Sequence, residues 1–494
     1  MTSIHPLMPS NLWKHFEMIC SIPHGSFNTK EIIETIRQIG VKLNMETLVD
    51  DAGNVMIRKP AYPGRENVPS VCLQSHVDMV CEHDPKYPRN MSKVPIKPIV
   101  VEDGEFGPKL MAEHTTLGAD DGIGVATALV ILESTDIKHG PLEFLFTNDE
   151  EVGMKGARAL KAGFLKSEFL VNLDSEEDWR ITVGCAGAFN VTHTGEAEKG
   201  QISEGSEALK LSLSQFKSGH SGCDIHLGRA NANSVLGRLL DSIVRAKIAF
   251  QLSDVNGGDK RNVIPSSATA VVVVKKEEAE KVKEVLEKEM STIKSEYLQI
   301  DPSILLTVSP VSLPSFVTTP SAAVTITQSA LTAPHGVLRS SPIDPSLVET
   351  SVNFFHFAVR EGPDGKITTE YEFFARSLRD SQLELQISSL SSRAALLGLS
   401  TSDPLNFYNG WAPDLTTSLF KATKAAFEQA QKKEPEIYTV HAGLECGIMM
   451  GQFPNLKCVS LGPHVTSPHT IEESLHLKSV KPFFETVIGL LEMM

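Results

Sequence analysis

Three acidic residues follow a run of apolar residues in the first third of the chain. The segment Phe144-Leu145-Phe146-Thr147-Asn148-Asp149-Glu150-Glu151 has the pattern of a buried strand that ends in clustered carboxylates. Such a cluster beside apolar structure is costly unless solvent or a cation compensates its charge. Taken alone, the cluster is typical of a solvated loop, because acidic side chains are mostly exposed in proteins.

Other predicted strand ends carry residues of the same kind. They contribute His76 and Asp78, Asp120 and Asp121, Asp174, and, near the C-terminus, His464 and His469. Each has an ordinary explanation: Asp120 could cap a helix, Asp174 could form a turn, and a single histidine is more often a packed residue than a ligand. Together, imidazoles and carboxylates without a thiolate are the ligand set that a pair of zinc ions takes.

The elements around these residues alternate between strand and helix. Residues 71–75, 142–147 and 169–173 have strand patterns, and residues 122–133 form an apolar helix. This alternation predicts a mostly parallel sheet with helices on both faces. Ligands of such sheets bind at the carboxyl ends of the strands, where these residues are expected.

The middle of the chain has a different pattern. Strand patterns occur at 209–214, 268–274, 350–359 and 371–377, and amphipathic helices are predicted at 230–250, 277–298 and 382–397. Two similar α/β layers, a duplicated unit, are one interpretation, although no residue-level repeat is visible. We therefore expect a catalytic domain formed by residues 1–186 and 396–494, with an inserted domain at 187–395. The predicted fold is α/β, with a three-layer mixed-sheet catalytic domain and an inserted α/β lid of two similar halves.

Composition excludes several classes of partner. The 494 residues carry a net charge of −15, which disfavours binding to nucleic acid or to an anionic membrane. No charged-then-apolar signal pattern begins the sequence, and no apolar run is long enough to span a bilayer. The seven cysteines are scattered, which favours reduced thiols and a cytoplasmic location.

Eight segments, in order over nearly the whole chain, resemble motifs of the two-zinc peptidase family that includes carboxypeptidase G and carnosinase. Among its members, the aminoacyl-histidine (Xaa-His) dipeptidases are the most similar. The segments are LQSHVDMV (73–80), TLGADDGIG (116–124), FTNDEEVGMKGA (146–157), LDSEE (173–177), GCAG (184–187), SGHSGCDIHLGRANA (218–232), RSLRDS (376–381) and HAGLECG (441–447).

The resemblance implies roles for the residues at the strand ends. His76, Asp120 and Asp174 would hold one zinc ion, and Asp120, Glu151 and His469 the other, with Asp120 as the bridge. His464 remains an alternative to His469. Asp78 would orient His76, and Glu150 would act as general base and then as general acid. Two zinc ions per chain are therefore expected, with cobalt or manganese as substitutes.

The resemblance also implies how a dipeptide would be bound. His220 would stabilise the oxyanion, Asn262 and Arg376 would bind the carboxylate end of the substrate, and Gly443 would allow close approach of the backbone to the ligand. A homodimer through the lid is expected. Two alternatives stay open: an N-acyl amino acid hydrolase or carboxypeptidase of the same family, and a non-enzymatic dimeric scaffold. The scaffold is disfavoured because all five ligand candidates and Glu150 are present.

Overall fold

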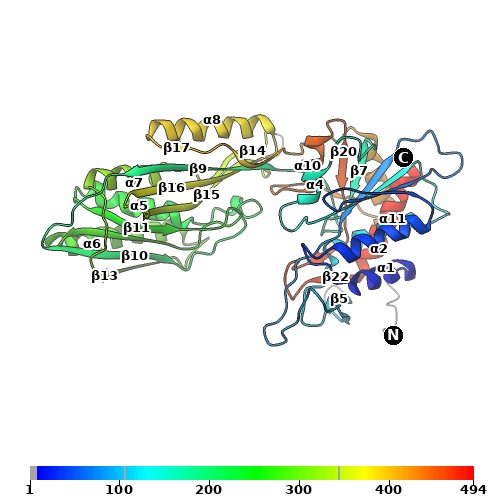
Figure 1. Cartoon of the computed structure of the whole chain (residues 1–494), viewed down its shortest axis with the longest axis horizontal. Coiled ribbons are helices and arrows are strands. Elements are labelled where there is room, and N and C mark those ends of the chain that lie inside the picture. Colours follow the sequence, from blue (N-terminus) through cyan, green and yellow to red (C-terminus); the bar gives the residue numbers. More distant parts are fainter. Residues whose placement is uncertain (1–7, 105–106, 343–344) are drawn as a thin grey trace. The chain divides into compact units, whose positions relative to one another are not determined.

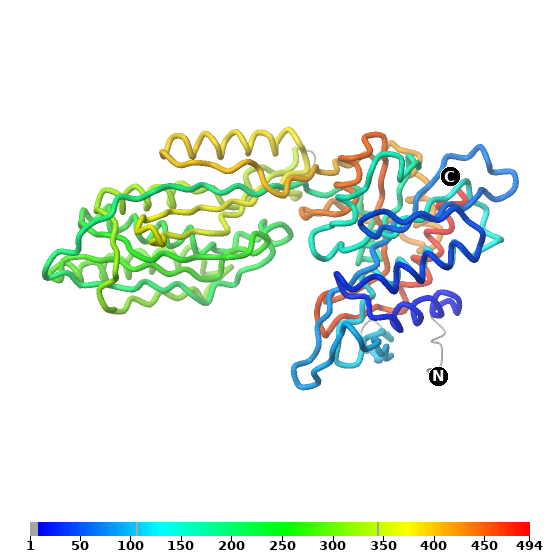
Figure 2. The backbone as a smooth tube through the Cα atoms, in the orientation of Figure 1, coloured from blue at the N-terminus to red at the C-terminus, as the bar shows by residue number. Residues whose placement is uncertain are grey.

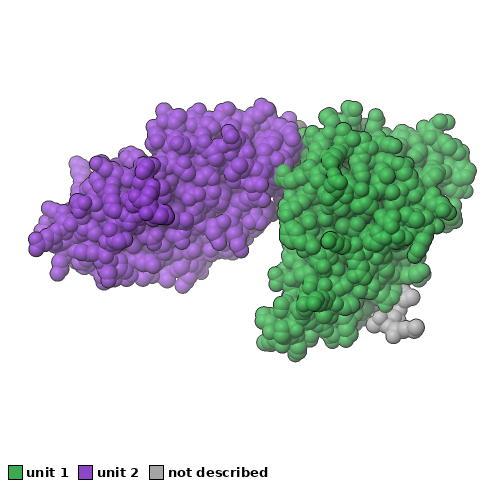
Figure 3. All heavy atoms as spheres, viewed as in Figure 1, with its two compact units in different colours: residues 1–185, 411–440, 444–494 green, residues 186–410, 441–443 purple. Residues whose placement is uncertain are grey.

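The computed structural model describes residues 8–104, 107–342 and 345–494, and divides into two compact units (Figures 1 and 3). Unit 1 comprises the chain up to Cys185, together with Trp411–Val440 and Leu444–Met494. Unit 2 comprises Ala186–Gly410 and His441–Gly443. The second break therefore comes at Gly410 rather than at the expected residue 395. It does so because β17 (Ser400–Thr401) and β18 (Leu405–Tyr408) still pair with β9 (Gly187–Ala197) of unit 2.

A mixed sheet of eight strands organises the described part of unit 1. In spatial order its strands are β1 (Glu46–Val49), β2 (Val55–Lys59), β6 (Leu142–Thr147), β3 (Val71–His76), β7 (Phe169–Asn172), β20 (Lys457–Ser460), β8 (Arg180–Cys185) and β19 (Glu436–Val440). Strand β3 runs parallel to both β6 and β7, so the carboxyl ends of these three strands lie at one edge. Every residue of β3 and β6 is buried, as expected for strands covered on both faces.

Five helices in the described part of unit 1 share the apolar core of this sheet. They are α1 (Ser10–Cys20), α2 (Lys30–Lys42), α3 (Ala119–Glu133), α9 (Ser418–Gln431) and α11 (Leu477–Met493). Helices α4 (Lys155–Ala159) and α10 (Glu445–Gln452) contact each other. Helix α3 is apolar on nearly all sides and correspondingly buried. A smaller sheet joins β21 (Val465–Thr466), β22 (Ser474–His476), β5 (Lys109–Ala112) and β4 (Pro98–Val101).

Unit 2 is built on an antiparallel sheet of ten strands within the described residues. Its main path is β13 (Leu305–Val311), β10 (Ser206–Ser214), β12 (Ala268–Lys275), β11 (Gln251–Gly257), β15 (Val348–Glu361), β16 (Ile367–Ser377), β9 and β17, while β14 (Gly336–Ser340) pairs with β15 and β18 with β9. Helices α5 (Ala232–Arg245), α6 (Ala279–Tyr297), α7 (Pro320–Leu331) and α8 (Asp380–Leu396) contribute apolar side chains to one core with this sheet. Two 3₁₀ turns lie at Ile225–Leu227 and Lys276–Glu278.

The connectivity of unit 2 shows an internal duplication. The elements β10-α5-β11-β12-α6-β13 and β9-α7-β15-β16-α8-β17 follow the same β-α-β-β-α-β order. In each half the fourth strand lies beside the first, then come the third and the second. The halves join where β11 pairs antiparallel with β15, through Val255↔Val359 and Asn256↔Ala358. Figure 2 traces how the first half is inserted between β9 and α7 of the second.

Candidate metal centre and substrate residues

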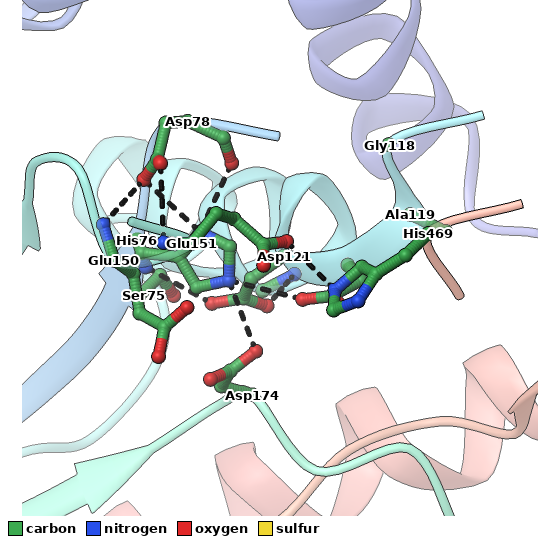
Figure 4. A network of polar contacts seen from close by, with 12 residues as sticks. Ser75, His76, Asp78, Gly118, Ala119, Asp121, Glu150, Glu151, Asp174 and His469 are labelled. Atoms are coloured by element: carbon green, nitrogen blue, oxygen red, sulfur yellow. Dashed lines mark hydrogen bonds and ion pairs between the residues drawn. The ribbon is translucent and has the colours of Figure 1, made fainter. Parts of the chain in front are cut away.

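The five expected metal ligands lie together at the carboxyl edge of the unit 1 sheet. Figure 4 labels His76, Glu151, Asp174 and His469 among them. His76 ends β3, Glu150 and Glu151 follow β6, and Asp174 follows β7. Asp120 lies in the first turn of α3, and His469 lies in the loop between β21 and β22. Parallel strands β3, β6 and β7 bring three of the ligands and Glu150 to one place, and the α3 terminus and the last loop supply the other two ligands.

Asp120 is shared between two groups of potential ligands. One group is His76, Asp120 and Asp174, and the other is Asp120, Glu151 and His469. Asp120 Oδ1 lies 3.0 Å from His76 Nε2, and Oδ2 lies 3.1 Å from His469 Nε2. His76 Nε2 also lies 3.3 Å from Asp174 Oδ1, and His469 Nε2 lies 3.0 Å from Glu151 Oε1. A carboxylate with one oxygen toward each imidazole has the arrangement of a bridging ligand.

The charge of this centre suits cations. Burial raises the pKa of Asp174 to about 7 and the pKa of Glu150 well above its ordinary value, with further contributions from neighbouring acids. Hydrogen bonds to Asp120 and Glu151 raise the pKa of His469 to about 11. Among the residues that the structure describes, no lysine or arginine forms an ion pair with these acids. Two divalent ions would supply the missing positive charge, so the donor set fits a two-metal centre.

Asp78 contacts both the loop that carries Glu150 and the imidazole of His76. Its Oδ1 accepts the backbone N–H of Glu150 at 2.9 Å, and its Oδ2 accepts the Ser26 hydroxyl at 2.8 Å. His76 Nδ1 lies 3.0 Å from the backbone oxygen of Asp78 and 3.5 Å from its Oδ1. Burial opposes ionisation of Asp78, but hydrogen bonding and the charge of His76 keep its pKa below the ordinary value. Such contacts fix the tautomer and direction of a ligating imidazole.

Residues without a predicted role also support the centre. Glu473 accepts the backbone N–H groups of Leu117, Gly118 and Ala119 at 2.7–3.0 Å, which positions the turn that carries Asp120. Asp121 Oδ2 accepts the backbone N–H of His76 at 3.2 Å. Glu473 lies more than 350 residues from this turn in sequence. The only local sign of its role is that it follows the expected ligand His469 by four residues.

His464 and Asp149 lie near the centre in sequence but belong to neither group of potential metal ligands. The His464 ring lies 4.2 Å from the His476 ring and 5.1 Å from Trp179, between centroids, rather than in either ligand group. Asp149 forms a turn at φ 52° and accepts the backbone N–H of Phe27 at 2.8 Å.

The expected substrate residues belong to unit 2, where three of them converge. A Cβ built on Gly222 would lie 3.2 Å from His220 and 3.1 Å from Arg376 Nε. One built on Gly443 would lie 2.5 Å from the Tyr408 hydroxyl, to which Arg376 Nη1 donates at 3.4 Å. Asn262 is exposed, and its carbonyl accepts the N–H of Ser221 beside His220.

His220 is held as a neutral imidazole with a defined tautomer. Its Nδ1 accepts the backbone N–H groups of Gly222 at 3.2 Å and Cys223 at 3.0 Å, which leaves the proton on Nε2. Burial, and then the charge of Arg376, lower the pKa of His220 to about 4. Nε2 is therefore a hydrogen-bond donor at neutral pH.

Arg376 is a buried cation. The residue is 4% exposed, and its guanidinium lies 4.5 Å from the centre of the Phe374 ring. Within the described residues, its Nε has no hydrogen-bond partner, and no carboxylate forms an ion pair with it. A buried guanidinium in this state suits an anionic ligand group.

Comparisons with known proteins agree with this geometry. The sequence model of the peptidase dimerisation domain, M20_dimer, matches residues 211–301. The cytosol non-specific dipeptidase of Escherichia coli (strain K12) is 34% identical over 492 residues, covering 100% of this chain and 99% of the relative. The crystal structure of the aminoacylhistidine dipeptidase from Vibrio alginolyticus superposes with a TM-score of 0.86 at 35% identity, over 98% of this chain and 96% of that one. The aminopeptidase PepT of Bacillus cereus shares the fold, with 17% identity, 99% coverage of both chains and a TM-score of 0.58.

Proposed function

The chain belongs to the M20 peptidase family, in the group of the cytosol non-specific and aminoacylhistidine dipeptidases, and we propose that it hydrolyses Xaa-His dipeptides at a two-metal centre. The single observation that carries the proposal is the shared carboxylate of Asp120, which directs one oxygen to His76 and the other to His469. His76, Asp120 and Asp174 would hold one ion, and Asp120, Glu151 and His469 the second.

Proton transfer is assigned to Glu150. Two bound ions would supply a water molecule of lowered pKa and would polarise the scissile carbonyl. Glu150 takes the proton of the attacking water and delivers it to the leaving amine. The backbone of Glu150 is fixed by Asp78, and burial raises the pKa of its carboxyl, which suits a group that must hold a proton between the two steps.

Substrate contacts are assigned to unit 2. His220 Nε2 donates to the oxyanion of the tetrahedral intermediate, and it can do so as a neutral imidazole across the working pH range. Arg376 binds the C-terminal carboxylate of the dipeptide. The absence of a side chain at Gly443 leaves room for the Tyr408 ring, whose hydroxyl accepts from Arg376 Nη1, and Gly443 contacts the ligand through its backbone. Asn262 is proposed to bind the carboxylate end together with Arg376.

The proposal extends to metal, assembly and location. Zinc is the proposed metal, with cobalt or manganese able to replace it at imidazole and carboxylate ligands. We propose a homodimer formed through unit 2, which contains the segment matched by the dimerisation model. The dimer would not form through the edge of β11 that faces β15, because β15 of the same chain already pairs with that edge.

A cytoplasmic location is proposed from the name of the E. coli relative. No helix of the described residues has the length and apolar character needed to cross a bilayer.

A substrate panel with metal control tests the function. Protein treated with a chelator and then with zinc, cobalt or manganese is assayed against Xaa-His dipeptides, other dipeptides and N-acyl amino acids. We expect metal-dependent cleavage of dipeptides, with Xaa-His substrates preferred. A preference for N-acyl amino acids would assign the chain to the alternative activity, and cleavage that survives complete metal removal would contradict the two-metal mechanism.

A further inference from the structure

A row of buried polar side chains lies directly beneath the proposed metal ligands. It consists of Gln74 in β3, Thr147 in β6, Asn172 in β7 and Ser460 in β20, and we name it the polar row. Gln74 and Asn172 each precede a ligand, His76 or Asp174, by two residues. Alternate residues of a strand share a face, so the row lies one step below the ligands on the same side of the sheet. Buried polar groups of this kind need internal hydrogen-bond partners.

The hydrogen bonds of the polar row all run in one direction. The Ser460 hydroxyl donates to Asn172 Oδ1, and Asn172 Nδ2 donates to Gln74 Oε1 at 2.7 Å. Gln74 Nε2 then donates to Glu445 Oε2 at 2.6 Å, and the Thr147 hydroxyl donates to the same oxygen at 2.8 Å. Glu445 is therefore the acceptor at which the row ends.

The burial and the contacts of Glu445 suit an acceptor at the end of the polar row. It is the first residue of α10 and is 1% exposed. Its Oε1 has no hydrogen-bond partner among the described residues, and its charge is one of the neighbouring charges that, after burial, raise the pKa of Asp174 and Glu150. The row also reaches a ligand directly, because Asn172 Oδ1 accepts the backbone N–H of Asp174 at 3.4 Å. Without Glu445, Gln74 and Thr147 would each lose the shorter of their hydrogen bonds and keep only the longer ones, from Gln74 Nε2 to Thr147 Oγ1 at 3.1 Å and from the Thr147 hydroxyl to the Ser75 backbone oxygen at 3.3 Å.

We infer that Glu445 is a positioning residue of the metal centre. By accepting from Gln74 and Thr147, it fixes the polar row and thereby the strand ends that carry His76, Glu151 and Asp174. This inference rests on the proposed function, since it assigns Glu445 a part in holding the same two ions. It makes metal affinity depend on an acceptor that touches none of the ligands.

The test compares Glu445→Ala with Glu445→Gln in the full chain. Zinc affinity is measured by competition with a chromophoric chelator, in the absence of substrate, and kcat and KM are measured on a dipeptide. Glu445→Ala is expected to bind zinc about 10–100-fold more weakly, the range found when partners of metal ligands are removed. It should also lower kcat while KM stays within about twofold. Glu445→Gln keeps an oxygen acceptor and should restore most of the zinc affinity.

Controls keep the inference falsifiable. Cys446→Ala alters the neighbouring buried residue of α10 outside the polar row and should leave zinc affinity unchanged. If Glu445→Ala does not fold, Thr147→Val removes one donor to Glu445 from the strand side, and a several-fold loss of affinity is then expected. Native zinc affinity in a folded Glu445→Ala or Thr147→Val variant, or equal losses in Glu445→Gln and Glu445→Ala, would overturn the inference. Failure of the wild type to cleave dipeptides would instead contradict the proposed function, because zinc affinity is measured without substrate.

Discussion

Asp78 and Glu150 are joined by a hydrogen bond of 2.9 Å from the Glu150 backbone N–H to Asp78 Oδ1. The same Asp78 residue contacts His76 Nδ1 through its backbone oxygen. One residue thus connects a proposed metal ligand with the loop that carries the proposed proton-transfer group. Orientation of the ligand and placement of the base are coupled through it.

This coupling predicts a combined effect of replacing Asp78. Asp78→Ala should lower both zinc affinity and kcat by about 10–100-fold, because the carboxylate that lies 3.5 Å from His76 Nδ1 and accepts the backbone N–H groups of Glu150 and Glu151 is removed, while the backbone contact to His76 stays. Asp78→Asn keeps one acceptor oxygen and should lose less. Ser26→Ala removes only the hydroxyl that donates to Asp78 and serves as the control. Unchanged zinc affinity in Asp78→Ala, measured by chelator competition, would contradict the coupling.

Adjacent residues Glu150 and Glu151 should separate chemistry from metal binding. Glu150→Ala is expected to retain two metal ions per chain while turnover falls by about 10²–10⁴-fold, the usual contribution of general acid–base catalysis. Glu151→Ala should lose metal, because Glu151 Oε1 lies beside His469 Nε2 in the second ligand group. Elemental analysis of the purified variants measures occupancy. Normal cleavage by Glu150→Ala would refute its role in proton transfer.

Arg376 should recognise the C-terminal carboxylate of the substrate. Wild-type protein is expected to cleave a dipeptide far better than its C-terminal amide, and Arg376→Ala should lose this discrimination mainly through a higher KM for the dipeptide. Arg376→Lys should restore little, because lysine cannot present the same planar pair of donors. The control is Arg379→Ala, since Arg379 is ion-paired with Glu349 and is about half exposed. Equal losses of activity on dipeptide and amide in Arg376→Ala would argue against carboxylate recognition.

Unit 2 should lose stability as the pH falls. Burial lowers the pKa of His193 and His335 to about 4 and the pKa of His441 to about 3. Below about pH 6.5 these histidines are protonated in the unfolded chain but stay neutral in the folded protein. Their contribution to the free energy of unfolding is therefore complete above pH 6.5 and is lost as the pH falls toward 4. The slope approaches about 1.4 kcal/mol per pH unit for each such group.

Urea denaturation of metal-free protein between pH 7.5 and 5.0 measures this slope. The His441→Gln variant should show a shallower dependence on pH, because one buried imidazole is removed. A variant of the exposed Cys223, such as Cys223→Ser, should keep the wild-type slope. A slope in His441→Gln equal to that of the wild type would contradict the assignment; the comparison between variants is decisive because the buried acids of unit 1, whose pKa values are raised, contribute with the opposite sign in both proteins.

Much of the strand and helix pattern could be predicted from local sequence. The apolar run 142–147 corresponds to β6, the alternation at 209–214 falls in β10, and the helix predicted at 277–298 is α6, at 279–297. Hydrophobic periodicity records burial directly, so these elements were accessible. The duplicated lid was also indicated, although only strand order made it certain, because two halves can share a topology without sharing residues.

The supporting residues of the metal centre could not be predicted. Glu445 and Glu473 lie hundreds of residues from Gln74 and Leu117, and nothing local distinguishes a buried acceptor from a solvated acid. The end of the lid was likewise placed too early. The short strands β17 and β18 carry little hydrophobic signal, and their pairing with β9 is a long-range contact.

The joined halves of unit 2 make one polypeptide equivalent to a fused heterodimer. When a sheet forms between identical subunits, every substitution appears on both sides of the seam. Across the β11–β15 seam, each side can change alone. His220, proposed for the oxyanion, lies in one half, and Arg376, proposed for the substrate carboxylate, lies in the other, while Asn262, also proposed for the carboxylate end, lies in the half of His220. For protein engineering, this means that the two sides of the seam can be changed independently, one mutation at a time.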